Sequence, residues 1–136
     1  MDLTKDKFTK ETVSIVLPLP PSILSPNAVC GSLGGRMKRA SATKKFRRLA
    51  REAAEREDIK TCPWHKATIK AVFYHKQNRR RDDVNHLAML KPAYDGLVDA
   101  NLLYDDDSEH LTTLPAEFQI DKDVSRVELT ITRVLT

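Results

Sequence analysis

The sequence predicts an α/β protein of the α+β kind, with a single mixed sheet of about four strands and helices packed on it. Several segments alternate apolar and polar residues, as strands with one buried face do. Two other segments carry apolar residues three and four positions apart, as amphipathic helices do. The 136 residues suffice for one hydrophobic core, so we expect one domain over residues 1–136, with residues 1–10 as a flexible N-terminal tail.

Four segments are predicted as strands. The first, Thr12–Leu19, is β-branched and apolar and ends at two prolines. Lys66–Lys76 alternates apolar with polar residues, and Trp64 before it is expected in the core or at its edge. Near the C-terminus, residues 111–120 and 125–135 are expected to form two more strands, joined by the turn Asp-Lys-Asp.

Two helices are predicted between these strands. Ser41 should cap a helix that runs to about Glu57, because apolar residues recur there at helical spacing. The segment from Pro20 to Ala40 is rich in proline, glycine and serine and predicts a long loop. A second helix is predicted in "HLAMLKPAYDGL", which Pro92 should kink or restart. Its apolar positions are Leu87, Leu90, Tyr94 and Leu97.

The charge of the chain favours a polyanionic partner. The net charge is +4, and the basic residues are clustered. Five of them lie around the first predicted helix. Because that helix is expected to start at Ser41, they fall in its first turns, where the helix macrodipole disfavours positive charge. These residues form either a solvated helical face or contacts to a phosphate backbone. They are Lys44, Lys45, Arg47, Arg48 and Arg51.

Other features argue against several classes of protein. Cys30 and Cys62 lack the spacing of a zinc site or a disulfide framework. The charged N-terminal residues precede only a short apolar run broken by prolines, unlike a signal peptide. No apolar stretch approaches the roughly 20 residues that span a bilayer. We therefore expect a soluble cytoplasmic protein with no membrane partner.

The segment "NRRRDDVNHLAMLKPAYDGLVDANLLYDDDSEH" holds two acidic clusters on either side of the second predicted helix. They are Asp82–Asp83 and Asp105–Asp107. Carboxylates suit hard cations such as Mg²⁺ or Mn²⁺, and a cation would relieve their repulsion if the clusters meet. The alternatives are a self-neutralising turn and a solvated acidic loop. His86 and His110 are expected at the surface or the edge of the core.

Basic residues accompany the acidic clusters. Three consecutive arginines, suited to bidentate phosphate contacts, precede the first cluster. Lys91 lies one helical turn before Asp95, at the spacing of an ion pair. Lys91 is therefore either half of a structural pair or a cation directed at the charge of a transition state.

This segment resembles the RusA-type Holliday junction resolvases, particularly their phage and prophage branch. The resemblance extends to "VLPLPPSILSPN" and the basic helix after it, so it covers most of the chain. The family pattern has an acidic pair written D-x-D-N, an apolar helix with a lysine, D-G-L or D-A-L, and a D-D pair. The matching elements are Asn85, Lys91–Pro92, Asp95–Gly96–Leu97 and Asp105–Asp106.

The chain departs from this pattern at Val84. With Asn85 matched to the asparagine of the family, Asp82 is the first aspartate and Val84 stands at the second, where it cannot bind a metal. In the other register Asp83 and Asn85 take the acidic places and His86 that of the asparagine. The spacing to the helical lysine favours the first register, in which Asp83 would compensate for Val84.

The resemblance implies a homodimeric endodeoxyribonuclease, dependent on Mg²⁺ or Mn²⁺, that resolves Holliday junctions by paired cuts in DNA recombination and repair. By resemblance, the catalytic residues are Asp82, Asp83, Lys91 and Asp106, and the metal ligands are Asp82, Asp83, Asp105 and Asp106. The residues expected to bind DNA phosphates are Arg36, Lys38, Arg39, Lys44, Lys45, Arg48, Arg79, Arg80 and Arg81. The alternatives are a non-catalytic junction-binding protein and a nuclease for other branched nucleic acids. Such a protein would associate with the nucleoid through its DNA substrate.

Overall fold

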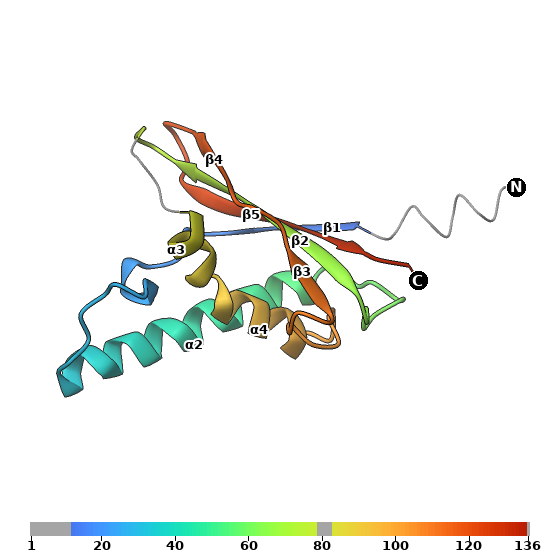
Figure 1. The fold of residues 1–136 in the computed structure, drawn as a ribbon, viewed down its shortest axis with the longest axis horizontal. Coiled ribbons are helices and arrows are strands. Elements are labelled where there is room, and N and C mark those ends of the chain that lie inside the picture. Colours follow the sequence, from blue (N-terminus) through green and yellow to red (C-terminus); the bar gives the residue numbers. More distant parts are fainter. Residues whose placement is uncertain (1–11, 79–82, 136) are drawn as a thin grey trace, which may run out of the picture.

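The structure is a computed structural model that describes residues 12–78 and 83–135, so the predicted tail lies outside the described residues. It has a mixed α+β fold with one mixed sheet (Figure 1), as the sequence predicts, but with five strands rather than about four. The elements are β1 (Thr12–Leu17), the 3-10 helix η1 (Ser22–Leu24), α2 (Leu33–Glu55), β2 (Ala67–His75), α3 (Asp83–Ala88), α4 (Lys91–Asp99), β3 (Leu111–Thr113), β4 (Glu117–Ile120) and β5 (Arg126–Arg133).

The central strand β2 organises the sheet. On one side it pairs antiparallel with β5, which pairs in turn with β1. On the other side it carries β3 and then β4, both parallel to it. Residues 111–120 were predicted as one strand, but Pro115, which has no N–H to donate to a ladder, lies where the strand is interrupted. Although they follow each other in the chain, β4 and β5 pair with opposite sides of β2 and not with each other.

One face of the sheet forms the core. In β1, β2 and β5 every second residue is buried, which is the alternation that the sequence predicts. The helices α2 and α4 lie together on one side of the sheet (Figure 1), and their buried residues belong to the same core as those of the strands. Trp64, only 1% exposed, also lies in this core, as expected.

The helix α2 begins earlier than predicted. Ser32 caps it, with its Oγ accepting a hydrogen bond from the N–H of Gly35 at 3.0 Å. The prediction of a loop up to Ala40 and a cap at Ser41 is therefore wrong. The glycines near residue 34 suggested a loop, but the first turn of a helix tolerates them behind a serine cap. The basic residues 44–51 consequently lie in the middle of α2, where the expected conflict with the macrodipole does not arise.

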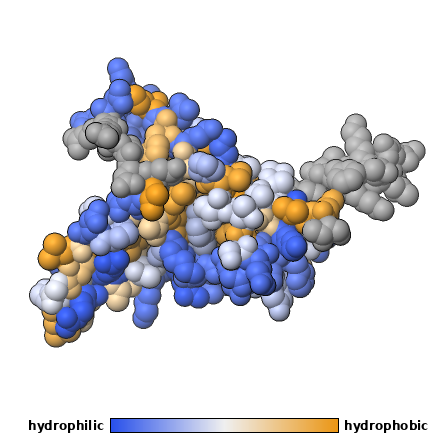
Figure 2. Space-filling view, in the orientation of Figure 1, coloured by the Kyte–Doolittle hydropathy of each residue, from blue (hydrophilic) through white to orange (hydrophobic). Residues whose placement is uncertain are grey.

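The N-terminal end of α2 carries exposed apolar side chains. Leu33 is 66% exposed and Met37 64% exposed, and Val29, just before the helix, is 97% exposed. Figure 2 shows apolar and hydrophilic surface side by side at the end of the molecule where α2 begins. Within the described residues, no helix has both the length and the apolar character needed to cross a bilayer.

The second predicted helix is divided into α3 and α4, and Pro92 lies in the first turn of α4, which confirms the predicted restart. The helix α4 packs very closely on α2, because a Cβ atom at Gly96 would lie 2.2 Å from the carbonyl oxygen of Arg47. The guanidinium of Arg47 also donates to Asp99, with Nε–Oδ2 and Nη2–Oδ1 distances of 2.5 and 2.8 Å. These contacts fix α4 relative to α2.

Candidate metal centre

The acidic loop, residues 104–110, follows α4 and is attached at both ends to the segment before β2. At its start, the N–H of Trp64 donates to Leu102 at 2.9 Å and the N–H of Tyr104 donates to the carbonyl of Trp64 at 3.0 Å. At its end, the N–H of Ala67 donates to the carbonyl of His110 at 2.9 Å. These hydrogen bonds hold the backbone of the acidic loop in a defined position beside the segment that precedes β2.

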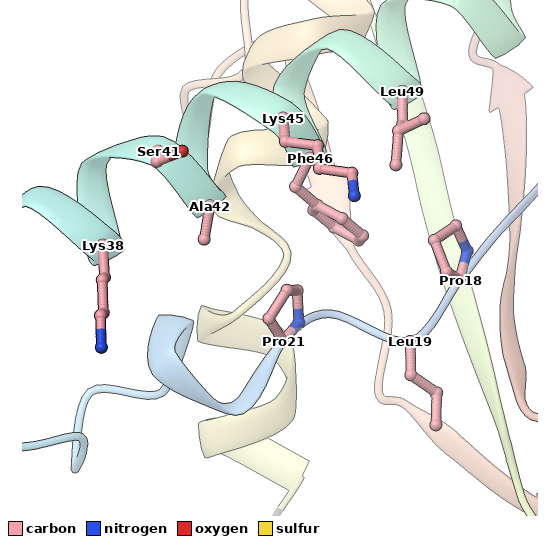
Figure 3. Close-up of a pocket in the computed structure, with 9 residues that line it drawn as sticks. All are labelled: Pro18, Leu19, Pro21, Lys38, Ser41, Ala42, Lys45, Phe46 and Leu49. Atoms are coloured by element: carbon pink, nitrogen blue, oxygen red, sulfur yellow. The ribbon is translucent and has the colours of Figure 1, made fainter.

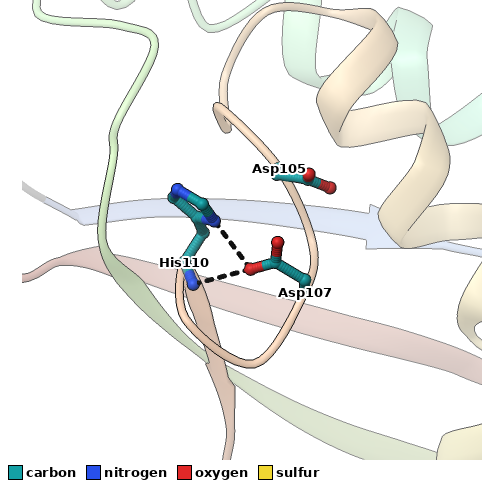
Figure 4. Close-up of side chains that lie close together, drawn as sticks. All are labelled: Asp105, Asp107 and His110. Carbon is teal, nitrogen blue, oxygen red and sulfur yellow. Dashed lines mark hydrogen bonds and ion pairs between the residues drawn. The ribbon is translucent and has the colours of Figure 1, made fainter.

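Three side chains of the acidic loop offer possible metal-ligand atoms and are called the donor group: Asp105, Asp107 and His110. One ligand atom from each lies within 4.8 Å of the others, as Figure 4 shows. Oδ1 of Asp107 is 2.6 Å from Nδ1 of His110 and also accepts hydrogen bonds from the N–H groups of Glu109 and His110. The bond from the His110 ring is the main cause of the lowered pKa of Asp107, so this carboxylate is ionised at neutral pH.

Aromatic packing orients the imidazole of the donor group. The ring of Tyr104 stacks on His65 with 4.5 Å between the ring centroids. The centroid of the Tyr104 ring also lies 5.0 Å from that of His110, and the two ring planes are tilted relative to each other. His110 is thus held by Tyr104 and by Asp107, which limits its rotation.

Next to the donor group, Asp106 forms an ion pair with Lys91. The side chain of Asp106 is only 12% exposed and accepts a hydrogen bond from Nζ of Lys91, which also donates to Asp95 at 3.0 Å. Burial is the largest single influence on the pKa of Asp106 and would raise it, but the hydrogen bond and the charge of Lys91, together with hydrogen bonds to Asp95 and Asp105, outweigh burial, so the pKa is lowered. The hydrogen bond between Lys91 and Asp106 also raises the pKa of Lys91. Both partners are therefore charged at neutral pH.

The chemistry of the donor group fits a divalent cation. Carboxylate oxygens suit Mg²⁺ and Mn²⁺, while an imidazole suits transition metals. The combination in Asp105, Asp107 and His110 therefore suits Mn²⁺ better than Mg²⁺. Binding through the imidazole requires neutral His110, because a protonated ring cannot be a ligand.

The first acidic cluster is only partly described. Asp82 lies outside the described residues, as do the three predicted phosphate ligands Arg79, Arg80 and Arg81. Asp83 is the first residue of α3, and only its backbone is described. A meeting of Asp82 and Asp83 with the acidic loop therefore stays a prediction.

The residues after Asp83 are placed by α3. Val84, which the predicted register matches to the second aspartate of the RusA pattern, is 77% exposed. Asn85 accepts a hydrogen bond from Ser25 at 3.1 Å, which ties α3 to the end of η1. The ring of His86 packs edge-on against Phe73 and Phe118, with 5.1 Å between centroids in each pair. His86 is thus at the edge of the core, as predicted.

The remaining predicted phosphate ligands all lie on α2. Three of them were expected on a loop, and their helical position is a correction: Arg36, Lys38 and Arg39. The other three lie further along the same helix: Lys44, Lys45 and Arg48. From Leu33 to Arg51 the helix contains no acidic residue, so the charged residues of this part of α2 are all basic.

Sequence reasoning placed Asp107 in the second acidic cluster but did not select it as a ligand, and it expected His110 at the surface or the edge of the core rather than in a metal site. It favoured the adjacent residues Asp105 and Asp106, because the family pattern contains two consecutive acids. In the structure Asp106 pairs with Lys91, whereas Asp105 joins Asp107 and His110. An aspartate and a histidine three residues apart were the available signal, but their approach depends on how the acidic loop is folded.

A scan against models of protein families found none that matches this chain, and a search of curated proteins found no match. Function is therefore inferred from the residues of the chain and their arrangement.

Proposed function

We propose that this protein is a divalent-cation-dependent endodeoxyribonuclease that cuts branched DNA and resolves four-way junctions in recombination and repair. The observation that carries this proposal is the composition of the acidic loop, which holds the donor group and also Asp106, the residue between Asp105 and Asp107 that forms an ion pair with Lys91. Hydrolysis of a phosphodiester requires stabilisation of the negative charge that develops on the phosphate. The acidic loop and Lys91 supply two means of doing so at neighbouring positions.

The donor group would hold the cation, with Asp82 and Asp83 as further ligands if the first acidic cluster lies close by. When bound, Mg²⁺ or Mn²⁺ would polarise the phosphate and lower the pKa of a water molecule. In the reaction, a water oxygen forms a bond to phosphorus, one P–O ester bond breaks, and the leaving oxygen acquires a proton.

Lys91 would act on the charge of the phosphate. Its raised pKa keeps the ammonium group protonated, and 62% of its side chain is exposed, so a substrate can reach it. Because Asp106 and Asp95 already bind the ammonium, these two carboxylates would position it. An ammonium held in this way stabilises the transition state without reorganising at the moment of reaction.

The basic series on α2 would bind the DNA backbone. Lysine and arginine contacts to phosphate position a protein on DNA without reading its sequence, which suits an enzyme that recognises the shape of a junction. A homodimer would place two sites on a nearly symmetric four-way junction, so that paired strands are cut. The three arginines before Asp82 would add bidentate phosphate contacts. A protein with this activity would lie in the cytoplasm with its DNA.

A second candidate function is non-catalytic binding of junctions. It is favoured by Val84, an exposed apolar residue where the family pattern has an acid, because a missing ligand would weaken a metal centre. The positive charges of α2 do not depend on that centre, so DNA binding would persist without cleavage.

Cleavage of synthetic DNA substrates separates these candidates. We expect the wild type to nick a labelled four-way junction at paired positions in Mn²⁺ or Mg²⁺ but not in EDTA. Asp106→Asn should bind the junction in a gel-shift assay yet fail to cut it. Asp123→Asn is the matched control, since Asp123 lies in the exposed turn between β4 and β5, and it should cut normally.

The possible outcomes differ clearly. Normal cleavage by Asp106→Asn would reject the proposed site. Binding of the junction by wild type without any cation-dependent nicking would establish the second candidate. Efficient cutting of flaps, forks or RNA branches, with the four-way junction left intact, would keep the nuclease and replace its substrate.

A further inference from the structure

A groove of about 460 Å³ lies between α2 and the proline-rich segment after β1. Figure 3 shows residues of one face of the helix opposite this segment. We propose that the groove docks an acidic peptide segment of a partner protein. One bulky apolar side chain of the peptide would enter the groove, and neighbouring carboxylates would bind Lys38 and Lys45.

The walls of the groove are largely apolar. On the helix side, the lining residues recur at the spacing of one helical face and are Lys38, Ser41, Ala42, Lys45, Phe46 and Leu49. The opposite wall comes from Pro18, Leu19 and Pro21. Prolines have no N–H group, so this wall is poorly suited to pairing with an added strand. The groove suits an inserted apolar side chain better.

The lysines give the groove its charge. Lys38 and Lys45 are both exposed and are seven residues apart, which places them about 10 Å apart along the helix axis. Within the described residues, the ion pairs of α2 involve Arg47, Arg48 and Arg51 and neither of these lysines. Two ammonium groups therefore remain on either side of the apolar centre, where carboxylates that flank an apolar anchor would lie.

The lining favours a peptide over an unpaired nucleobase. A base stacks on an exposed aromatic face, but the one aromatic side chain of the lining, Phe46, is only 2% exposed. The polar edges of a base also need hydrogen-bond partners, and among the uncharged side chains of the lining only Ser41 has a polar group. A leucine-like side chain needs neither, and its burial in the groove is favourable.

The test uses the full chain without metal or DNA, titrated into fluorescein-labelled peptide Gly-Ser-Asp-Asp-Leu-Asp-Asp-Gly-Ser while anisotropy is measured. Ser41→Glu introduces a carboxylate between the two lysines at an exposed helical position. We expect it to weaken binding at least about fivefold by pairing with the lysines and repelling the peptide. A peptide with serine in place of leucine should bind about tenfold more weakly.

Lys44→Ala is the matched control. It lies on the same helix, outside the groove lining, and changes the net charge by the same amount as Ser41→Glu. We expect it to change the affinity less than about twofold, because only a screened long-range interaction is lost. Circular dichroism and thermal unfolding verify that both variants are folded.

Several results would overturn the proposal. The wild type could show no saturable binding, or it could bind the leucine and serine peptides equally, which would indicate charge attraction alone. Equal losses in Ser41→Glu and Lys44→Ala would have the same meaning. A short oligothymidylate is titrated in parallel. If Ser41→Glu abolishes its binding and leaves peptide binding intact, the groove is a nucleic-acid site.

Discussion

Lys91, in the first turn of α4, donates a hydrogen bond to Asp106, which lies 15 residues further along the chain. This bond brings the end of α4 nearest α3 into contact with the acidic loop. Asp106 is largely buried while Lys91 is mainly exposed, so the carboxylate anchors the ammonium and the ammonium faces solvent. The relationship joins the helical lysine and the acidic pair of the sequence motif in one place.

Lys91→Ala should raise the pKa of Asp106. Burial pushes that pKa upward. The hydrogen bond and the charge of Lys91 are the largest of the contributions that together overcome it, so their loss removes most of the opposition to burial. NMR detection of the Asp106 carboxyl carbon during a pH titration measures the change. Lys44→Ala, on the exposed surface of α2, should leave the pKa as it is. An unchanged pKa in Lys91→Ala would show that the pair is not formed in solution.

The stabilisation supplied by Asp106 should disappear in acid. Because folding lowers the pKa of Asp106, its ionised carboxylate stabilises the folded state at pH values above its ordinary pKa of 3.8. This contribution is lost as the pH falls through the folded-state pKa. Urea unfolding of wild type and Asp106→Asn should therefore give a difference in free energy at neutral pH that shrinks below pH 3.8. A difference that stays constant with pH would contradict the coupling.

Asp107→Asn should weaken Mn²⁺ binding by about tenfold or more, because it removes one carboxylate of the donor group and the partner that orients His110. Isothermal titration calorimetry measures the affinity. Glu109→Gln is the matched control, since it removes one negative charge from the same loop outside the donor group. Equal losses in the two variants would indicate diffuse attraction of cations to an acidic surface.

Gly96→Ala should lower the free energy of unfolding by about 1–3 kcal/mol, because the added methyl overlaps the backbone of α2. In Gly34→Ala the new methyl would meet nothing within 4 Å. This control should raise the free energy of unfolding by up to about 1 kcal/mol through helix propensity. Chemical denaturation measures both values. A neutral Gly96→Ala would show that α4 does not approach α2 so closely.

Local patterns in the sequence were sufficient to predict much of the fold. Alternation identified β2 and β5 because each has one buried face, and Pro92 marked the restart at α4 because proline is well tolerated in a first helical turn. The predicted start of α2 was wrong because the cap at Ser32 outweighed the glycines that follow it. Strand pairing across β2 joins residues far apart in the chain, and no local pattern encodes it.

The candidate site was predictable in its composition but not in its grouping. The spacing of one helical turn between Lys91 and Asp95 correctly predicted that they form an ion pair. The approach of Asp107 to His110 depends on the path of the acidic loop, which hydrogen bonds to Trp64 and Ala67 determine. A row of three aspartates in a sequence does not show which of them turns toward a lysine and which toward a histidine.

The central claim is that the acidic loop holds a divalent cation beside Lys91, and anomalous diffraction from a crystal soaked in Mn²⁺ tests it most directly. We predict one anomalous peak within coordination distance of Asp105, Asp107 and His110. If the first acidic cluster contributes, Asp82 or Asp83 will lie next to the same peak. Density that shows these residues well ordered with no anomalous peak at the acidic loop, or with the peak elsewhere on the molecule, would contradict the claim.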